Sequence, residues 1–155
     1  MKDLLSVSMD HLEYPAEQVW DERRRWVESL AEPPTAWGGY SISEQAAALS
    51  ADVQASFCAG AWVAVVVLAA AVIDAQLRED AMPGFAGNAR DLITAVGLDA
   101  RFQELRKRRN ALVHVKPDNP ALTVDGQWDD RLALEKEARA AIELMFETFH
   151  LDLWV

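Results

Sequence analysis

The sequence contains a single cysteine, Cys58, among its 155 residues. One cysteine excludes an intramolecular disulfide and a cysteine-rich zinc site, and its place in an apolar run predicts a small buried side chain. Histidine is also scarce, and His150 with Asp152 forms an isolated pair near the C-terminus rather than a set of metal ligands. A glycine-rich phosphate loop and a serine nucleophile elbow are both lacking. We therefore expect neither a metal site nor an organic cofactor.

The longest uncharged run, residues 53–73, lacks the Lys and Arg flanks that orient a transmembrane helix. It is long enough to cross a bilayer. Its neighbours are Asp52 and Asp74, however, so burial in a core or in a subunit interface is favoured. The first residues also lack a basic region followed by an apolar core. We expect a cytoplasmic protein with no membrane partner.

Low-complexity tracts, internal repeats and domain linkers are lacking as well, while 51% of the residues are hydrophobic. This composition predicts one domain over residues 1–155. Apolar residues recur at spacings of three and four among many Ala, Leu, Glu and Arg residues, which predicts an all-α fold. We predict an up-and-down bundle of about five helices, covering roughly 11–31, 42–80 with a break near 50–52, 88–97, 99–114 and 128–150.

Several local signals set the ends of these predicted helices. Asn88 and Asp99 are expected N-caps, and Ser41 with Glu44 has the spacing of a capping box. The segment 117–127 reads as a loop, with a short extended piece at 122–124.

Positive charge is scarce: 15 Lys and Arg against 25 Asp and Glu give a net charge of −10 at pH 7. Acidic proteins are not general nucleic-acid binders. Residues 101–116 are the exception, because they contain six basic residues and one acidic residue. A positive island in an acidic body indicates one local anion site, although a solvated basic helix face produces the same pattern.

The basic stretch ends in the motif Arg-Asn-Ala-Leu-Val-His, residues 109–114. Arg109 offers a fixed fork of donors for a phosphate, and His114 can accept or donate a proton near neutral pH. Asn110 adds a neutral donor and acceptor that can orient either group. Asn110 and His114 share a helix face, and a frayed last turn can bring Arg109 and His114 toward one phosphate. Alternatively, His114 is a plain helix-end residue and Arg109 a surface charge.

The pattern from Leu105 to His114, which follows an Ala-rich helix carrying Asp74, resembles the HEPN superfamily. The mark of that family is an Arg, often followed by Asn, with a His a few residues later. The resemblance covers about residues 52–116, the central half of the chain. It implies a HEPN-like helical bundle that forms a homodimer, in which the uncharged 53–73 helix could pack against its symmetry mate.

The resemblance also implies an activity, that of a metal-independent endoribonuclease with a toxin or phage-defence role. Its composite site would lie at the dimer interface. Arg109 would hold the scissile phosphate, Asn110 would position it, and His114 would orient or deprotonate the ribose 2′-hydroxyl. Asp74 would be a supporting acid, or else a plain surface carboxylate. Attraction for RNA would come from the other basic residues of the stretch: Arg106, Lys107, Arg108 and Lys116.

Other functions stay open at this point. Many HEPN proteins have lost catalysis, so the chain could be a helical module that binds RNA, a nucleotide or a protein partner. The motif could also be a coincidence in a structural dimer. Some HEPN toxins carry a Tyr that a partner enzyme modifies where this chain has Lys116, which disfavours that pairing and leaves other kinds of antitoxin or regulatory protein open. Trp37 and Tyr40 are candidates for stacking on a base.

Overall fold

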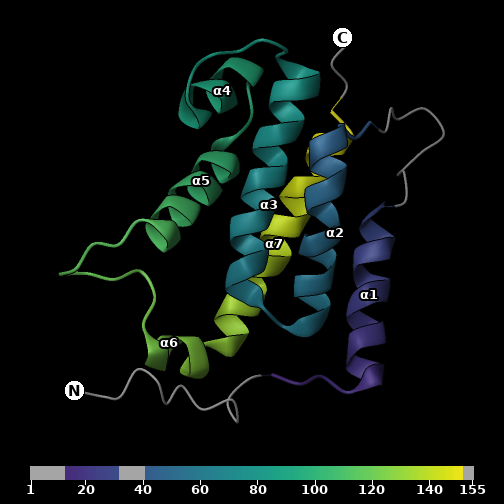
Figure 1. The fold of residues 1–155 in the computed structure, drawn as a ribbon, viewed down its shortest axis with the longest axis vertical. Coiled ribbons are helices and arrows are strands. Elements are labelled where there is room, and N and C mark those ends of the chain that lie inside the picture. Colours follow the sequence, from purple (N-terminus) through teal and green to yellow (C-terminus); the bar gives the residue numbers. More distant parts are fainter. Residues whose placement is uncertain (1–12, 32–40, 152–155) are drawn as a thin grey trace.

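The computed structural model describes residues 13–31 and 41–151, and every regular element within these ranges is a helix (Figure 1). The predicted all-α class is confirmed. The described part of the chain forms seven α-helices, against the five predicted. Their bounds are α1 Glu17–Ala31, α2 Glu44–Ala59, α3 Trp62–Gln76, α4 Ala89–Val96, α5 Ala100–Val113, α6 Val124–Asp129 and α7 Arg131–Phe149, and a π-helical turn, η3 Leu77–Ala81, continues α3.

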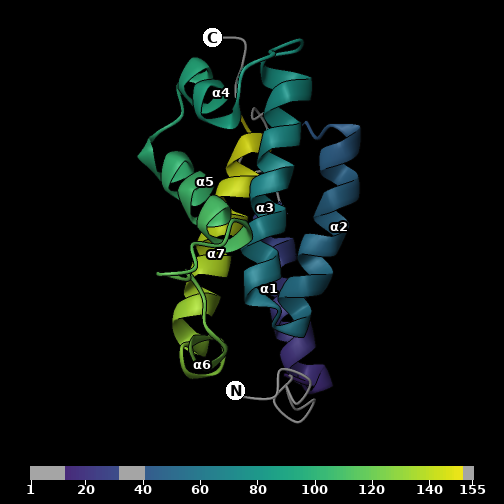
Figure 2. The same ribbon diagram turned by 60° about the vertical axis from the view of Figure 1, so that its left-hand side comes forward.

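The five long helices, α1, α2, α3, α5 and α7, alternate in direction along the chain, and α4 and α6 are short pieces at opposite ends of the bundle (Figures 1 and 2). Helix α3 lies at the centre and packs against α2, α7 and α5. Helix α1 covers the outer side of α2, while α5 stands on the other side of α3. The arrangement therefore leaves α5 on one flank, where only part of its surface contacts the bundle.

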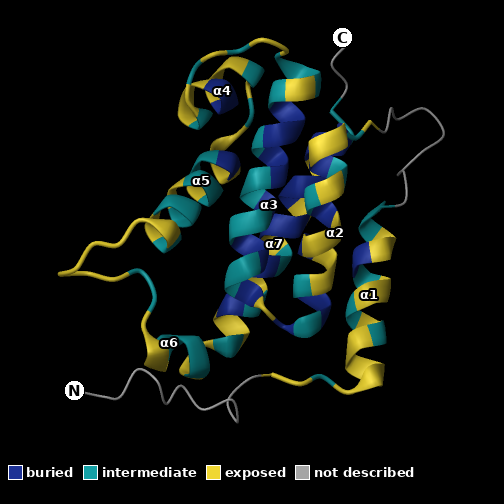
Figure 3. Cartoon of the chain, viewed as in Figure 1, coloured by how far each residue is buried: buried dark blue, intermediate teal, exposed yellow. Residues whose placement is uncertain are grey.

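The uncharged run that the sequence placed in a core or interface forms the end of α2 and most of α3. More than half of α3 is buried (Figure 3). Its buried side chains pack with those of α2 and α7 in a single hydrophobic cluster. Cys58 is buried as predicted, at 4% exposure. In the ranges that the structure describes, no helix is long and apolar enough to cross a membrane.

The helical segment expected over 42–80 is divided in two, because the chain turns at Gly60. Gly60 has φ +79° and ends α2 in the left-handed conformation. Its N–H donates to Phe57 O, and the Ala61 N–H donates to Ser56 O, the two bonds of a Schellman motif. The suggested break at residues 50–52 is wrong, since these residues lie inside α2. This turn sends α3 back along α2 and separates the two helices.

Other helix ends agree with the sequence in part. Asn88 Oδ1 accepts from the Asp91 N–H and Asp99 Oδ1 accepts from the Arg101 N–H, so both predicted N-caps are confirmed. A helix was expected from about residue 11, but α1 begins at Glu17, and residues 13–16 are not helical. The predicted capping box is wrong, because Ser43 is the N-cap residue of α2.

The expected extended piece at 122–124 is also wrong. Thr123 caps the short helix α6, and its hydroxyl accepts from the Gly126 N–H at 2.9 Å. Helix α7 follows after Asp130, so the single helix expected over 128–150 is two. The stacking candidates Trp37 and Tyr40 lie outside the described residues.

Candidate functional site

Helix α5 carries the motif, and both of its ends are defined by local contacts. Asp99 caps the N-terminus, and the Arg101 side chain bonds Asp99 and reaches Glu147 on α7 at 2.8 Å. The hydrogen bond from Arg101 lowers the pKa of the Asp99 carboxyl, which keeps this cap ionised. At the other end, the His114 N–H donates to Asn110 O and the backbone then becomes extended. The helix therefore ends at His114, as the sequence predicts.

The side chains of α5 divide between two faces, as expected for residues spaced three and four apart on a helix. Phe102, Arg106, Arg109 and Asn110 face α3 and α4, where they line one groove. Arg101, Glu104 and Arg108 face α7 and line a second groove of about 460 Å³. The basic stretch therefore does not form one continuous surface.

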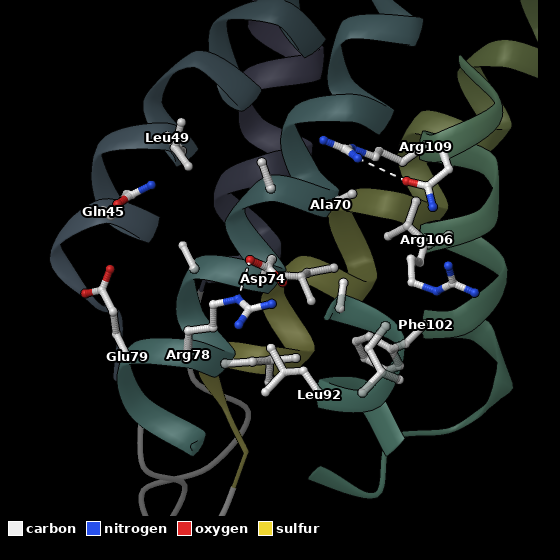
Figure 4. Close-up of a pocket in the computed structure, with 18 residues that line it drawn as sticks. Gln45, Leu49, Ala70, Asp74, Arg78, Glu79, Leu92, Phe102, Arg106 and Arg109 are labelled. Carbon is white, nitrogen blue, oxygen red and sulfur yellow. Dashed lines mark hydrogen bonds and ion pairs between the residues drawn. The ribbon is translucent and has the colours of Figure 1, made fainter. Parts of the chain in front are cut away.

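The first groove has a volume of about 540 Å³ and lies between α5 on one side and α2, α3 and α4 on the other (Figure 4). Its floor is apolar and includes Ala70 and Ala71 of α3. These two alanines leave space between α2 and α5 that larger side chains would fill. We refer to this space as the α3 groove.

Arg109 and Asn110 stand together on the α5 wall of the α3 groove. Arg109 Nη1 donates to Asn110 Oδ1 at 3.0 Å, as the dashed line in Figure 4 shows. Among residues 13–31 and 41–151, no carboxylate forms an ion pair with Arg109, although the chain is acidic overall. Most of the donors of this guanidinium fork are left for another acceptor, and a phosphate fits such a fork.

His114 does not share the α3 groove with these two residues. It is exposed and is not among the residues that line the groove. Its backbone has φ −117° and ψ 102°, so the helical spacing that relates Asn110 to His114 no longer sets the direction of its side chain. Within one copy of the chain, the structure brings Arg109 and Asn110 together and leaves His114 at the exposed tip of α5.

Asp74, the expected supporting acid, lies on the α3 wall of the same groove. Its Oδ2 accepts from Arg78 Nε at 2.8 Å, an i,i+4 pair on α3 and its π-helical extension. Arg78 also donates to the carbonyl oxygens of Phe85 and Gly87, which holds the loop before α4 in place. The second oxygen of Asp74, Oδ1, is buried and accepts no hydrogen bond. Asp74 thus shares the groove with Arg109 and Asn110 but is held by Arg78.

The other basic residues expected to attract RNA have different surroundings. Arg108 pairs with Glu137 of α7 at 3.2 Å and donates to Ala121 O. Lys107 pairs with Glu104 on the exposed side of α5. Arg106 bonds Gln103 and lines the α3 groove beside Arg109, while Lys116 is exposed in the turn after α5. Arg106 is therefore the basic residue that shares a wall with Arg109.

Sequence reasoning missed several residues of the groove. Arg78 was detectable, because its spacing of four from Asp74 is that of a helical ion pair. Gln45 and Leu49 of α2 and Glu79 of η3 also line the groove. No local pattern marks these three residues, since only the packing of α2 against α3 brings them to the site.

Two other chemistries find little support in the described residues. Burial raises the pKa of the Cys58 thiol, which keeps it protonated and a poor nucleophile. No group of three or more His, Cys, Asp or Glu side chains in the described ranges is placed to hold a metal ion.

No protein-family model matches this chain, and neither a curated protein nor a solved structure is significantly similar to it.

Proposed function

We propose that this chain is a metal-independent endoribonuclease of the HEPN type, which acts in the cytoplasm as a homodimer with a toxin or phage-defence role. The observation that carries the proposal is the Arg109–Asn110 pair on the wall of the α3 groove. The pair is hydrogen-bonded and Arg109 lacks a carboxylate partner in the described part of the chain. An arginine that is oriented but not neutralised is suited to hold a scissile phosphate and stabilise its growing charge.

The chemistry assigned to the motif needs a base near that phosphate. His114 would take the proton of the ribose 2′-hydroxyl, whose oxygen then attacks the adjacent phosphorus. The bond to the 5′-oxygen of the next nucleotide breaks, and that oxygen leaves as a hydroxyl after receiving a proton from water. The products are a 2′,3′-cyclic phosphate and a 5′-hydroxyl, and no metal enters the scheme.

The exposed position of His114 gives the homodimer a role in this proposal. His114 does not line the groove beside Arg109 of its own copy, so a second copy would supply the histidine. Val113 and Val115 flank His114 and are 41% and 79% exposed, which leaves apolar surface at the tip of α5 for a partner to cover. An antitoxin or regulatory protein could cover the same surface and block the site.

The first test is incubation of the purified protein with unstructured RNA in EDTA. We expect cleavage with cyclic-phosphate ends, and a loss of about 10²-fold or more in rate for Arg109→Lys and His114→Ala. Arg25→Lys is the matched control, because Arg25 is an exposed arginine on α1, away from the groove. Circular dichroism checks that all variants keep the helical fold. Full activity in both motif variants would refute the nuclease.

A second candidate function is a non-catalytic helical module that binds RNA, a nucleotide or a protein partner. The position of His114 outside the groove favours it, because anion binding by Arg109 and Asn110 does not require that residue. This candidate predicts RNA binding that weakens with salt, no cleavage product, and a loss of affinity in Arg109→Ala but not in His114→Ala.

A further inference from the structure

The α3 groove is larger than the contact of one phosphate with Arg109 requires. At about 540 Å³ it falls within the range of small-molecule pockets, roughly 300–1,000 Å³. Leu49, Ala70, Ala71 and Leu92 contribute apolar surface to it. Such surface favours the faces of a planar group such as a nucleobase, but it offers a phosphate neither a hydrogen bond nor a positive charge.

The two sides of the groove differ in charge. The α5 side carries Arg106 and Arg109, neither of which pairs with a carboxylate among the described residues, whereas the opposite side carries Asp74, Glu79 and the amide of Gln45 (Figure 4). Arg78 also lies on that opposite side, but it donates hydrogen bonds to Asp74 and to two loop carbonyl oxygens. A fitting ligand is therefore negative at the end that meets α5 and rich in N–H donors at the end that meets α3.

Asp74 has an acceptor to spare at this second end. Arg78 binds Oδ2, while Oδ1 is shielded from water and has no donor. A buried polar atom without a partner costs stability that a ligand donor recovers on binding. Asp74 lines the groove and the end torsion of an Asp side chain is soft, so rotation about this torsion would let Oδ1 meet a ligand donor.

From these observations we infer that the α3 groove is a nucleobase-binding site that selects bases with an exocyclic amino group, with Asp74 as the residue that reads the amino group. The phosphate attached to that base lies against Arg109. The inference rests on the proposed function in taking RNA as the source of the base, although a free nucleotide offers the same chemistry. Uracil fits poorly, because its carbonyl oxygens would face the Asp74 carboxylate.

Nucleoside monophosphates that differ in this one group test the inference by isothermal titration. CMP and UMP form one such pair, and AMP and IMP form another. We expect the amino-bearing member of each pair to bind about tenfold tighter or more, as is typical for a hydrogen bond to a charged acceptor. In Asp74→Asn the preference disappears, because the new amide can donate to a carbonyl oxygen of the base.

Glu135→Gln is the matched control for Asp74→Asn. Glu135 also forms a half-exposed i,i+4 pair with an arginine, Arg139, but lies on α7 away from the groove. The control keeps the preference of the parent protein. Equal affinity of the parent for CMP and UMP, or a preference that survives in Asp74→Asn, overturns the inference.

A second variant tests the groove without touching its charges. Ala71→Leu places a larger side chain on the floor, and we expect it to reduce the affinity for CMP and AMP by tenfold or more. Ala55→Leu adds the same atoms to an exposed position of α2 and is its control. If Ala71→Leu binds nucleotides as the parent does while keeping its fold, the base does not lie in this groove.

These binding readouts are independent of RNA cleavage. Amino selectivity without cleavage would reject the nuclease and keep the base site, whereas cleavage without selectivity would reject the base site alone. Titration of oligo(C) into the His114→Ala variant then separates the two sources of the base. Oligo(C) binding tenfold tighter than CMP identifies RNA as the ligand, and equal affinities identify a free nucleotide.

Discussion

Neighbouring arginines of the basic stretch, Arg108 and Arg109, have different hydrogen-bond partners. Among the described residues Arg109 donates only to Asn110, whereas Arg108 donates to Glu137 and to Ala121 O. The sequence predicts that Arg108 and Arg109 lie on one helix, because the residues that form and cap this helix are close together in the sequence. It does not predict which of them is neutralised, since Glu137 lies 29 residues away and meets Arg108 only when α7 packs beside α5.

This difference predicts the outcome of Arg108→Ala. The substitution removes an ion pair in which the two side chains are 30% and 42% exposed, together with a bond to a backbone carbonyl. We expect the free energy of unfolding to fall by about 1 kcal/mol, measured by urea denaturation. The affinity of the folded protein for RNA should change by less than about threefold. A loss of affinity as large as that of Arg109→Ala would place Arg108 in the anion site instead.

At the scale of helices, signals close to each helix end are the dependable ones. Asn88 and Asp99 have the side chains that cap helices, and both do so. The turn at Gly60 also has a local signal, a glycine, but the residues on both sides of it are uncharged and mostly apolar, and the break was expected near residues 50–52 instead. The division between α6 and α7 lacks a signal of comparable strength, because Asp129 and Asp130 also suit a helix start. The number of helices was therefore underestimated.

The turn at Gly60 can be tested against a second glycine. Gly60 and Gly97 both end helices, with φ +79° and +81°. A Cβ on Gly97 would meet no atom within 4 Å, whereas a Cβ on Gly60 would overlap the Glu13 side chain. We expect Gly97→Ala to cost about 1 kcal/mol through backbone strain alone, and Gly60→Ala to cost clearly more. Equal losses in thermal unfolding would mean that Glu13 moves aside without cost.

Across the whole molecule, Glu13 joins the segment before α1 to the start of α7. Its carboxylate accepts from Arg23 and Arg131, and both guanidinium groups lie over the ring of the buried Trp62. Partial burial raises the pKa of Glu13, but the hydrogen bonds from Arg131 and Arg23 outweigh that effect and lower it below its usual 4.5. The ionised carboxylate is thus favoured in the folded protein.

A carboxyl group whose pKa is lower in the folded state stabilises the fold at pH values above its unfolded-state pKa. This stabilisation is lost as the pH falls through the folded-state pKa. We therefore expect Glu13→Gln to reduce the free energy of unfolding by about 1 kcal/mol at pH 7. The difference between variant and parent should shrink below about pH 4.5 and vanish once Glu13 is protonated in the folded state. Urea denaturation at several pH values measures it. A difference that stays constant down to pH 3 would show that the carboxylate charge is not its source.

The largest scale is the pair of copies, because the proposed site needs Arg109 from one chain and His114 from another. If so, two inactive variants should restore each other when mixed. A dimer of one Arg109→Ala copy and one His114→Ala copy contains one intact site, formed by the Arg109 and the His114 that remain.

With random exchange, half of the dimers are mixed and each has one of its two sites, so about a quarter of the parent activity should return. The measurement is RNA cleavage after the two variants are unfolded together and refolded, with each variant refolded alone as the control. Recovered activity places the two residues on different chains at one phosphate. If parent activity is present but the mixture stays inactive, Arg109 and His114 act within one chain, which requires the tip of α5 to fold back toward its own groove.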